Sequence, residues 1–218
     1  MDFVMFRLVC TLIILFVSFL NTSCSSFRMP HAAITEPVPV GSLSRYTNYP
    51  ENVKTVIERA WWLSRKNLTY QFGSSNPKRG GMDCSGVIYY LLKSIDHGDV
   101  PRDSYDMYRW LAKAGTIHHV TSYHFHSKQF NALKPGDLLF WTNTYHTRRR
   151  PPITHVMLYL GKNKNGKPLM FGSSDGGVYR GREMWGVSVF EFVLPYRSDR
   201  ARFVAYGCIP HYTCYSIF

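Results

Sequence analysis

The chain has 218 residues, a formal net charge of +12 at pH 7 and a hydrophobic content of 45%. This length fits one domain of ordinary size with a leader and is too short for two full enzyme domains. Aromatic residues make up 16% of the chain, which excludes an intrinsically disordered protein. The positive charge favours an anionic partner without identifying the anion.

The N-terminus has the features of an export signal. Residues 8–20 form an unbroken apolar run, which is short for a membrane-spanning helix and suits the core of a signal peptide. Small and polar residues and then Cys24 follow at once, and this arrangement resembles a bacterial lipoprotein processing site. We therefore expect residues 1–24 to be a signal peptide with a lipobox, and Cys24 to be the lipid attachment site. The alternative is ordinary signal cleavage that leaves Cys24 without a lipid.

Residues 25–48 are rich in proline, serine and threonine and show no periodicity, so we expect a tether or an extended arm. Residues 49–218 are then a single folded domain. Apolar residues recur at helical spacing in its first half and predict helices over 51–66, 84–95 and 101–114. Its second half predicts strands over 137–141, 155–160, 169–173, 187–192 and 202–206. Helices first and antiparallel strands second are typical of the α+β class.

The position of Cys84 makes it a candidate nucleophile. It begins a predicted helix, where the positive end of the helix dipole favours a thiolate. Gly80, Gly81 and Gly86 surround it and let a substrate approach the sulfur. A cysteine nucleophile also needs a base and a third group that orients the base. An isolated cysteine is more often a small buried core residue, so the rest of the chain must decide.

Five short motifs occur in a fixed order along the chain: Tyr70-Gln71-Phe72-Gly73, Asp83-Cys84-Ser85-Gly86, Val100-Pro101-Arg102-Asp103-Ser104, Pro135-Gly136-Asp137-Leu138 and His155-Val156-Met157-Leu158-Tyr159. Together they resemble the NlpC/P60 family of bacterial cell-wall cysteine peptidases over about residues 50–195. The resemblance implies a papain-like α+β core in which a helix bears the nucleophile and packs on an antiparallel sheet that bears the base. By the family pattern Cys84 is the nucleophile, His155 is the base, and Tyr70, Asp83 and Ser85 contact the substrate.

The third catalytic residue departs from the family pattern. Phe171 occupies the usual position of a His, Asn or Gln, and a phenyl ring accepts no hydrogen bond from an imidazole. Side chains alternate along a strand, so residues 171, 173 and 175 share a face if the strand continues. We expect Asp175 to orient His155, with Ser173 or a backbone carbonyl as the alternative.

The resemblance implies an exported cysteine endopeptidase of the bacterial cell envelope. Its substrate is peptidoglycan or released muropeptides, and the scissile bond joins D-γ-glutamate to meso-diaminopimelate or lysine. We expect no cofactor, no metal and no nucleic-acid partner, and membrane anchoring through a lipid on Cys24. Two rival functions remain: a catalytically inactive wall-binding lipoprotein, favoured by Phe171, and an amidase or acyltransferase of the same superfamily.

Three further features stay open. Cys208 and Cys214 lie six residues apart and are able to form a disulfide in an exported protein. The arginines at 148–150 are either a solvated loop or a rim that attracts carboxylates of the substrate. The segment 99–133 is long for the family, and we expect it to narrow the cleft and favour small substrates.

Overall fold

The structure is a computed structural model, and it describes residues 31–214. The predicted signal peptide and Cys24 lie outside the described residues. Within residues 31–214, no helix has the length and apolar character needed to cross a membrane.

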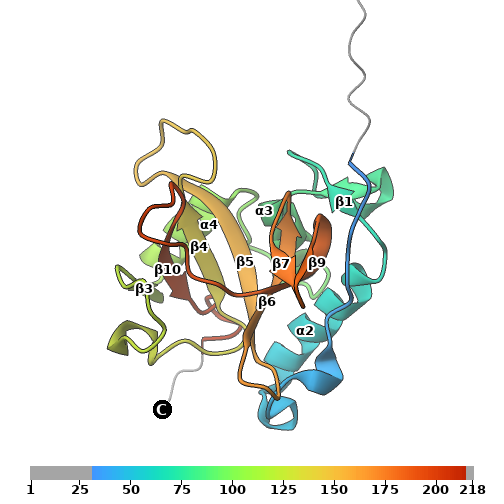
Figure 1. Cartoon of the computed structure of the whole chain (residues 1–218), viewed down its shortest axis with the longest axis horizontal. Helices are drawn as coiled ribbons and strands as arrows, with labels where there is room; N and C mark the ends of the chain where they lie inside the picture. Colours follow the sequence, from blue (N-terminus) through green and yellow to red (C-terminus); the bar gives the residue numbers. More distant parts are fainter. Residues whose placement is uncertain (1–30, 215–218) are drawn as a thin grey trace, which may run out of the picture. The chain divides into compact units, whose positions relative to one another are not determined.

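A six-stranded antiparallel sheet forms the centre of the domain (Figure 1). Its strand order is β3-β10-β4-β5-β6-β9. The bounds are β3 (Ile117–His119), β4 (Leu138–Thr142), β5 (Ile153–Lys162), β6 (Pro168–Ser174), β9 (Gly186–Glu191) and β10 (Arg202–Gly207). Two small pairs accompany it: β1 (Thr69–Tyr70) with β2 (Gly81–Met82), and β7 (Val178–Tyr179) with β8 (Arg182–Glu183). All five predicted strands are present within this sheet.

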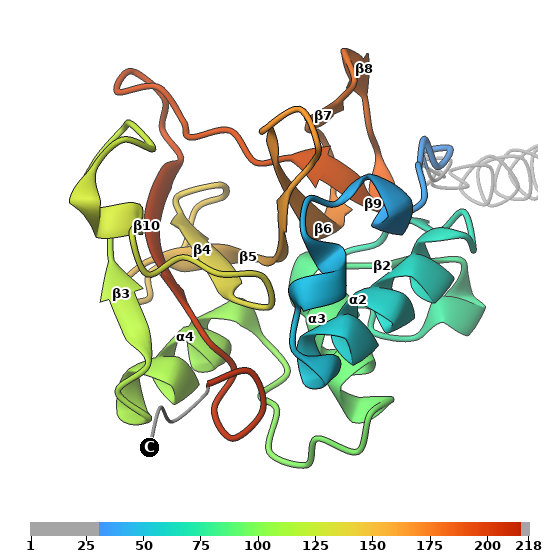
Figure 2. The same cartoon turned by 90° about the horizontal axis from the view of Figure 1, so that it is seen from below.

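Among residues 31–214, three α-helices precede the long strands: α2 (Glu51–Ser64), α3 (Cys84–Lys93) and α4 (Ser104–Lys113). Short 3-10 helices lie at η2 (Val40–Ser42), η3 (Tyr46–Asn48), η4 (Pro77–Arg79) and η5 (Lys128–Phe130). The helices gather on one side of the sheet, where α3 packs on β5 and β6 and α4 packs on β5 (Figure 2). The α+β class with helices on an antiparallel sheet is therefore confirmed, and the helices end within a few residues of their predicted ends.

The packing of α3 on the sheet places Cys84. Val87, Ile88, Leu91 and Leu92 are completely or almost completely buried, because they form the apolar stripe that faces β5 and β6. Burying one such side chain contributes about 1.5–3 kcal/mol. This face fixes the helix axis, so the first residue of α3 is held at the same end of the domain as the start of β5.

Residues 31–48 form an arm that lies against the domain. The backbone N–H of Val38 donates to the Ser64 hydroxyl of α2 at 3.0 Å, and the N–H of Glu36 donates to the Ser188 hydroxyl of β9 at 2.8 Å. The side chains of Val38 and Leu43 are buried. The described part of the segment predicted as a tether is thus packed on the domain by backbone hydrogen bonds and two apolar side chains.

A disulfide joins Cys208 to Cys214 after β10. The sequence did not decide whether this pair is bonded, and the structure shows that it is. Among residues 31–214, Cys84 is then the cysteine that keeps a free thiol.

A glycine in the first turn of α3 tests this packing. A Cβ added at Gly86 would overlap the Ser74 carbonyl oxygen, which belongs to the loop beside the helix start. We expect Gly86→Ala to lower the free energy of unfolding by about 1–3 kcal/mol in urea titrations. Gly41→Ala is the matched control, because nothing lies near its added Cβ. Equal stability of the two variants would contradict the close packing.

Candidate active site

Cys84 is the first residue of α3, and its side chain is buried. Burial and then the negative charge of Asp83 raise the pKa of the thiol to about 12. Hydrogen bonds from the backbone N–H groups of Val156 and Ser85 act in the opposite direction on the pKa and are outweighed. The helix dipole was expected to favour a thiolate, but desolvation prevails, and the neutral thiol is the resting form.

Asp83 caps α3 and collects several hydrogen bonds. Its Oδ1 accepts from the N–H of Gly86 at 2.6 Å and from the Ser85 hydroxyl at 3.2 Å, and its Oδ2 accepts from the N–H of Gly73 at 2.8 Å. Arg102 donates to both carboxylate oxygens, at 3.1 and 2.9 Å. The carboxylate therefore joins the helix start, the loop after β1 and the segment before α4.

These contacts bear on the predicted substrate-binding roles of Asp83 and Ser85. The Ser85 hydroxyl donates to Asp83 and accepts from Arg102 at 3.0 Å. An amino group of a substrate would have to compete with Arg102 for the carboxylate. In the sequence Arg102 stood out only as part of a motif. Its ion pair with Asp83 joins residues nineteen positions apart, and no sequence spacing predicts such a pair.

His155 lies on β5, opposite Trp141 of β4, and the two rings meet edge to face at 5.6 Å. Burial lowers the pKa of the imidazole to about 4, and the charges of Asp175 and Asp83 only partly oppose this shift. The next residue, Val156, donates its N–H to the Cys84 sulfur. The structure thus brings the predicted nucleophile to the strand of the predicted base, and the neutral imidazole is the form that accepts a proton.

The three candidates for the third position have different environments. Phe171 is buried in the ladder between β5 and β9. The Ser173 hydroxyl donates to the Met82 carbonyl at 2.6 Å, so its hydrogen is already used. Asp175 lies just after the end of β6 and is exposed.

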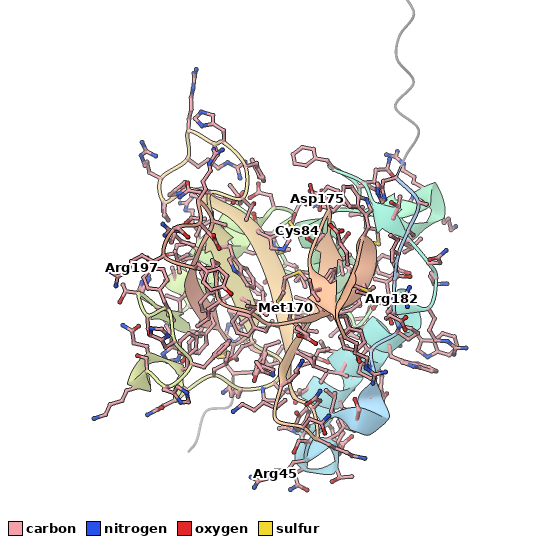
Figure 3. All side chains as sticks on the ribbon, in the orientation of Figure 1. Arg45, Cys84, Met170, Asp175, Arg182 and Arg197 are labelled. Carbon is pink, nitrogen blue, oxygen red and sulfur yellow. A yellow bond between two sulfur atoms is a disulfide. The ribbon has the colours of Figure 1, made fainter. Side chains whose placement is uncertain are left out.

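Of these candidates, Asp175 is the group whose charge reaches the imidazole. It is the first of two carboxylates that oppose the lowered pKa of His155. Figure 3 labels Asp175 and Cys84 in the central part of the domain. Both groups also act on Tyr70, because burial first and then their charges raise the pKa of its phenol. The strand itself ends at Ser174, so Asp175 acts from a bend and not from the continuous strand that the alternation argument assumed.

A cavity of about 280 Å³ opens above Cys84. Tyr70, Asp83 and Ser85, the three residues predicted to contact the substrate, line it together with the thiol. Sequence reasoning assigned no role to two further lining residues, Phe72 and Tyr145. Arg149 also lines the cavity, and it belongs to the arginines at 148–150 for which the sequence left a solvated loop and a substrate-attracting rim open. Phe72 belongs to a recognised motif, whereas nothing in the local sequence distinguishes Tyr145. We call this cavity the cleft.

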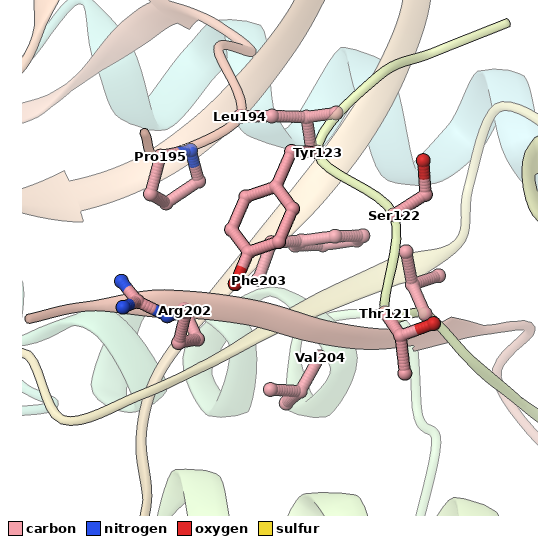
Figure 4. Close-up of a pocket in the computed structure, with 9 residues that line it drawn as sticks. Thr121, Ser122, Tyr123, Leu194, Pro195, Arg202, Phe203 and Val204 are labelled. Atoms are coloured by element: carbon pink, nitrogen blue, oxygen red, sulfur yellow. The ribbon is translucent and has the colours of Figure 1, made fainter. Parts of the chain in front are cut away.

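The long segment 99–133 contributes little to the cleft. Only Arg102, Asp103 and Ser104 of that segment line it, and the rest runs through α4 to β3 at the far edge of the sheet. Residues 120–123 instead border a second cavity of about 260 Å³ beside β10 (Figure 4). There Arg202 donates to the backbone carbonyls of Tyr196, Arg197 and Ala201, and the lining holds no acid–base pair.

The segment with four histidines, 118–126, shows no metal site. In the described part of the chain, no three His, Cys, Asp or Glu side chains converge as metal ligands would.

The pKa of His155 predicts a pH dependence of stability. In the unfolded chain the imidazole takes up a proton below about pH 6.5, whereas in the folded protein it does so only near pH 4. The unfolded state therefore binds more protons in this window, and stability falls as the pH drops through it. We expect wild type to lose up to about 3 kcal/mol more than His155→Gln between pH 7 and pH 4, less whatever solvent screening removes.

Urea titrations of both proteins at the two pH values measure this difference. Burial raises the pKa of Asp137 to about 7, so this carboxyl also titrates in the window. It contributes equally to both proteins and cancels. Equal losses of stability in wild type and variant would show that the folded environment does not resist protonation of His155.

Two curated proteins similar to this chain are named as endopeptidases. Murein DD-endopeptidase MepH of Escherichia coli is 35% identical over 95 residues, which cover 44% of this chain and 29% of that protein. Probable endopeptidase YafL of the same organism is 33% identical over 92 residues, which cover 42% of this chain and 30% of that protein. The chain thus spans less than a third of the length of these relatives.

Among solved structures, a lipoprotein-like NLP/P60 family protein from Staphylococcus aureus matches with a TM-score of 0.47 and 21% identity, over 72% of this chain and 42% of that one. The sequence profile of the NlpC/P60 family matches residues 67–179, just over half of the chain. This stretch contains Cys84, His155 and all three predicted substrate-binding residues. The chain belongs to the NlpC/P60 family.

Proposed function

We propose that this protein is a cysteine peptidase that hydrolyses an amide bond in the peptide part of peptidoglycan. The observation that carries the proposal is the free thiol of Cys84 at a helix start, in a cleft and in contact with the strand of a neutral imidazole. Family membership and the relatives named as murein and probable endopeptidases support the same reaction class.

The proposed reaction begins with proton transfer from the Cys84 thiol to His155. The sulfur attacks the carbonyl carbon, and in this proposal the backbone N–H of Ser85, which faces the Cys84 sulfur, donates to the developing oxyanion. The imidazolium then protonates the leaving amine, and the C–N bond breaks to leave a thioester. Water, deprotonated by His155, cleaves the thioester and restores the thiol. Asp175 stabilises the imidazolium through its charge.

Two scissile bonds fit this chemistry. The sequence analysis favours the bond between D-γ-glutamate and meso-diaminopimelate or lysine. The relative named DD-endopeptidase favours a bond between two D-centres, such as the D-alanyl bond of a cross-link. An amino end of a short stem would have to compete with Arg102 for the Asp83 carboxylate, and this weakens one support for the first candidate.

The proposed place of action is the cell envelope after export, on peptidoglycan or released muropeptides. The apolar run at 8–20 and the relatives named for murein support this location. Attachment of a lipid to Cys24 is part of the same proposal.

Mass spectrometry of products tests the function and the bond together. Wild type is incubated with the tripeptide L-Ala-γ-D-Glu-meso-diaminopimelate and with a cross-linked muropeptide dimer. Free diaminopimelate identifies the first bond, and muropeptide monomers identify the second. We expect Cys84→Ala and His155→Gln to lower the rate by at least about a thousandfold, because nucleophile and base act as one unit.

His118→Gln, an exposed histidine outside the cleft, is the matched control and should retain full activity. Product formation by Cys84→Ala at the wild-type rate would overturn the mechanism. Unchanged substrates in every wild-type reaction would instead favour the inactive wall-binding protein, and release of a different amine or acyl product would favour the amidase or acyltransferase.

A further inference from the structure

Two aromatic side chains face each other across the cleft. Phe72 stands on the loop after β1 with 73% of its surface exposed, and Tyr145 stands on the loop between β4 and β5 with 41% exposed. Their rings meet edge to face with centroids 6.0 Å apart, and both line the cavity that contains Cys84. We call Phe72 and Tyr145 the aromatic pair.

The loop that carries Tyr145 is fixed on both sides of this residue. The N–H and the hydroxyl of Thr144 both donate to the Thr154 hydroxyl at 2.9 Å. Farther along, Arg149 forms a two-pronged ion pair with Asp103, at 2.9 and 3.3 Å. These contacts tie the loop to β5 and to the start of α4, so Tyr145 is held in place before any substrate arrives.

The opposite loop is fixed through the helix cap. The N–H of Gly73 donates to Asp83, and the N–H of Asp83 donates to the Ser74 carbonyl at 2.9 Å. Phe72 therefore sits on a loop that is anchored immediately beside Cys84. Two anchored loops whose aromatic rings touch form a bridge over the mouth of the cleft.

The charges on the cleft walls balance. Arg102 is paired with Asp83 and Arg149 with Asp103, and all four residues line the cleft. Shape thus decides which substrates reach Cys84 more than charge does. The cavity of about 280 Å³ lies at the small end of ligand pockets, which range over about 300–1,000 Å³.

We infer that Phe72 and Tyr145 are specificity-determining residues that bridge the cleft, admit a soluble peptide strand and oppose stem peptides that are still attached to the polymeric wall. This inference rests on the proposed peptidase function. The rings offer apolar faces to the backbone of a narrow peptide beneath them. A peptide that is still attached to the glycan polymer is bulkier, so it has to part the rings and lose their contact.

The ratio of kcat/KM on intact sacculi to kcat/KM on a soluble stem peptide measures the selection. We expect Phe72→Ala and Tyr145→Ala to raise this ratio roughly three- to tenfold, the range that loss of an aromatic pair contact provides. Tyr145→Phe keeps the ring and should match wild type. Tyr196→Ala removes a tyrosine that is 75% exposed and outside the cleft, and it is the matched control.

Alkylation of Cys84 supplies a second measurement that does not need hydrolysis. Its rate with iodoacetamide and with a bulky maleimide is followed by mass spectrometry of the peptide that contains Cys84. We expect wild type to react slowly with the bulky reagent relative to the small one, and Tyr145→Ala to narrow this gap roughly three- to tenfold.

The two measurements separate the possible failures. An unchanged alkylation gap in both alanine variants would overturn the aromatic pair, whatever the activity. A narrowed gap in a protein that hydrolyses no peptidoglycan substrate would support the bridge and refute the proposed function. A substrate ratio that rises equally in Tyr196→Ala would also overturn the assignment, because that residue does not line the cleft.

Discussion

The buried carboxylate of Asp83 holds together the parts of the domain that make the cleft. It caps α3 at Cys84, accepts an N–H from the loop that carries Phe72, and pairs with Arg102 in front of α4. A buried charge is costly unless its hydrogen bonds are satisfied, and these donors supply that condition. The positions of the groups around the Cys84 thiol therefore depend on the contacts of this one carboxylate.

Burial also sets the protonation states in the cleft. It raises the pKa of the Cys84 thiol and lowers the pKa of the His155 imidazole, so both groups rest neutral. In the proposed mechanism a neutral thiol and a neutral base exchange a proton only when a substrate arrives. The charge of Asp175 partly opposes the lowering of the His155 pKa by burial, as the proposed orienting role requires. The unusual Phe171 is simply part of the core.

The fold was predictable where local patterns are strong. Within residues 31–214, apolar periodicity identified the three α-helices and the five long strands, and the ordered motifs singled out Cys84 at the start of α3 and His155 on β5. The short strands β1, β2 and β3 were not predicted, because two or three residues are too few to show a strand periodicity. The packing of residues 31–48 also escaped, because it depends on hydrogen bonds to α2 and β9 that are distant in sequence.

The same limit applies to the site. The pairing of Arg102 with Asp83 and the contact of Tyr145 with Phe72 join distant loops, and neither leaves a spacing signal in the chain. The sequence already favoured Asp175 over Ser173 as the orienting group, and the structure adds that the Ser173 hydroxyl donates to the Met82 carbonyl.

A double-mutant cycle on Asp83 and Arg102 tests the central role of the carboxylate most directly. The free energy of unfolding is measured in urea for wild type, Asp83→Asn, Arg102→Gln and the double variant. If Asp83 and Arg102 act as one unit, the losses of unfolding free energy in the two single variants add up to at least about 1 kcal/mol more than the loss in the double variant. Strict additivity within about 0.5 kcal/mol would show that the pair is independent and that the cleft does not depend on it.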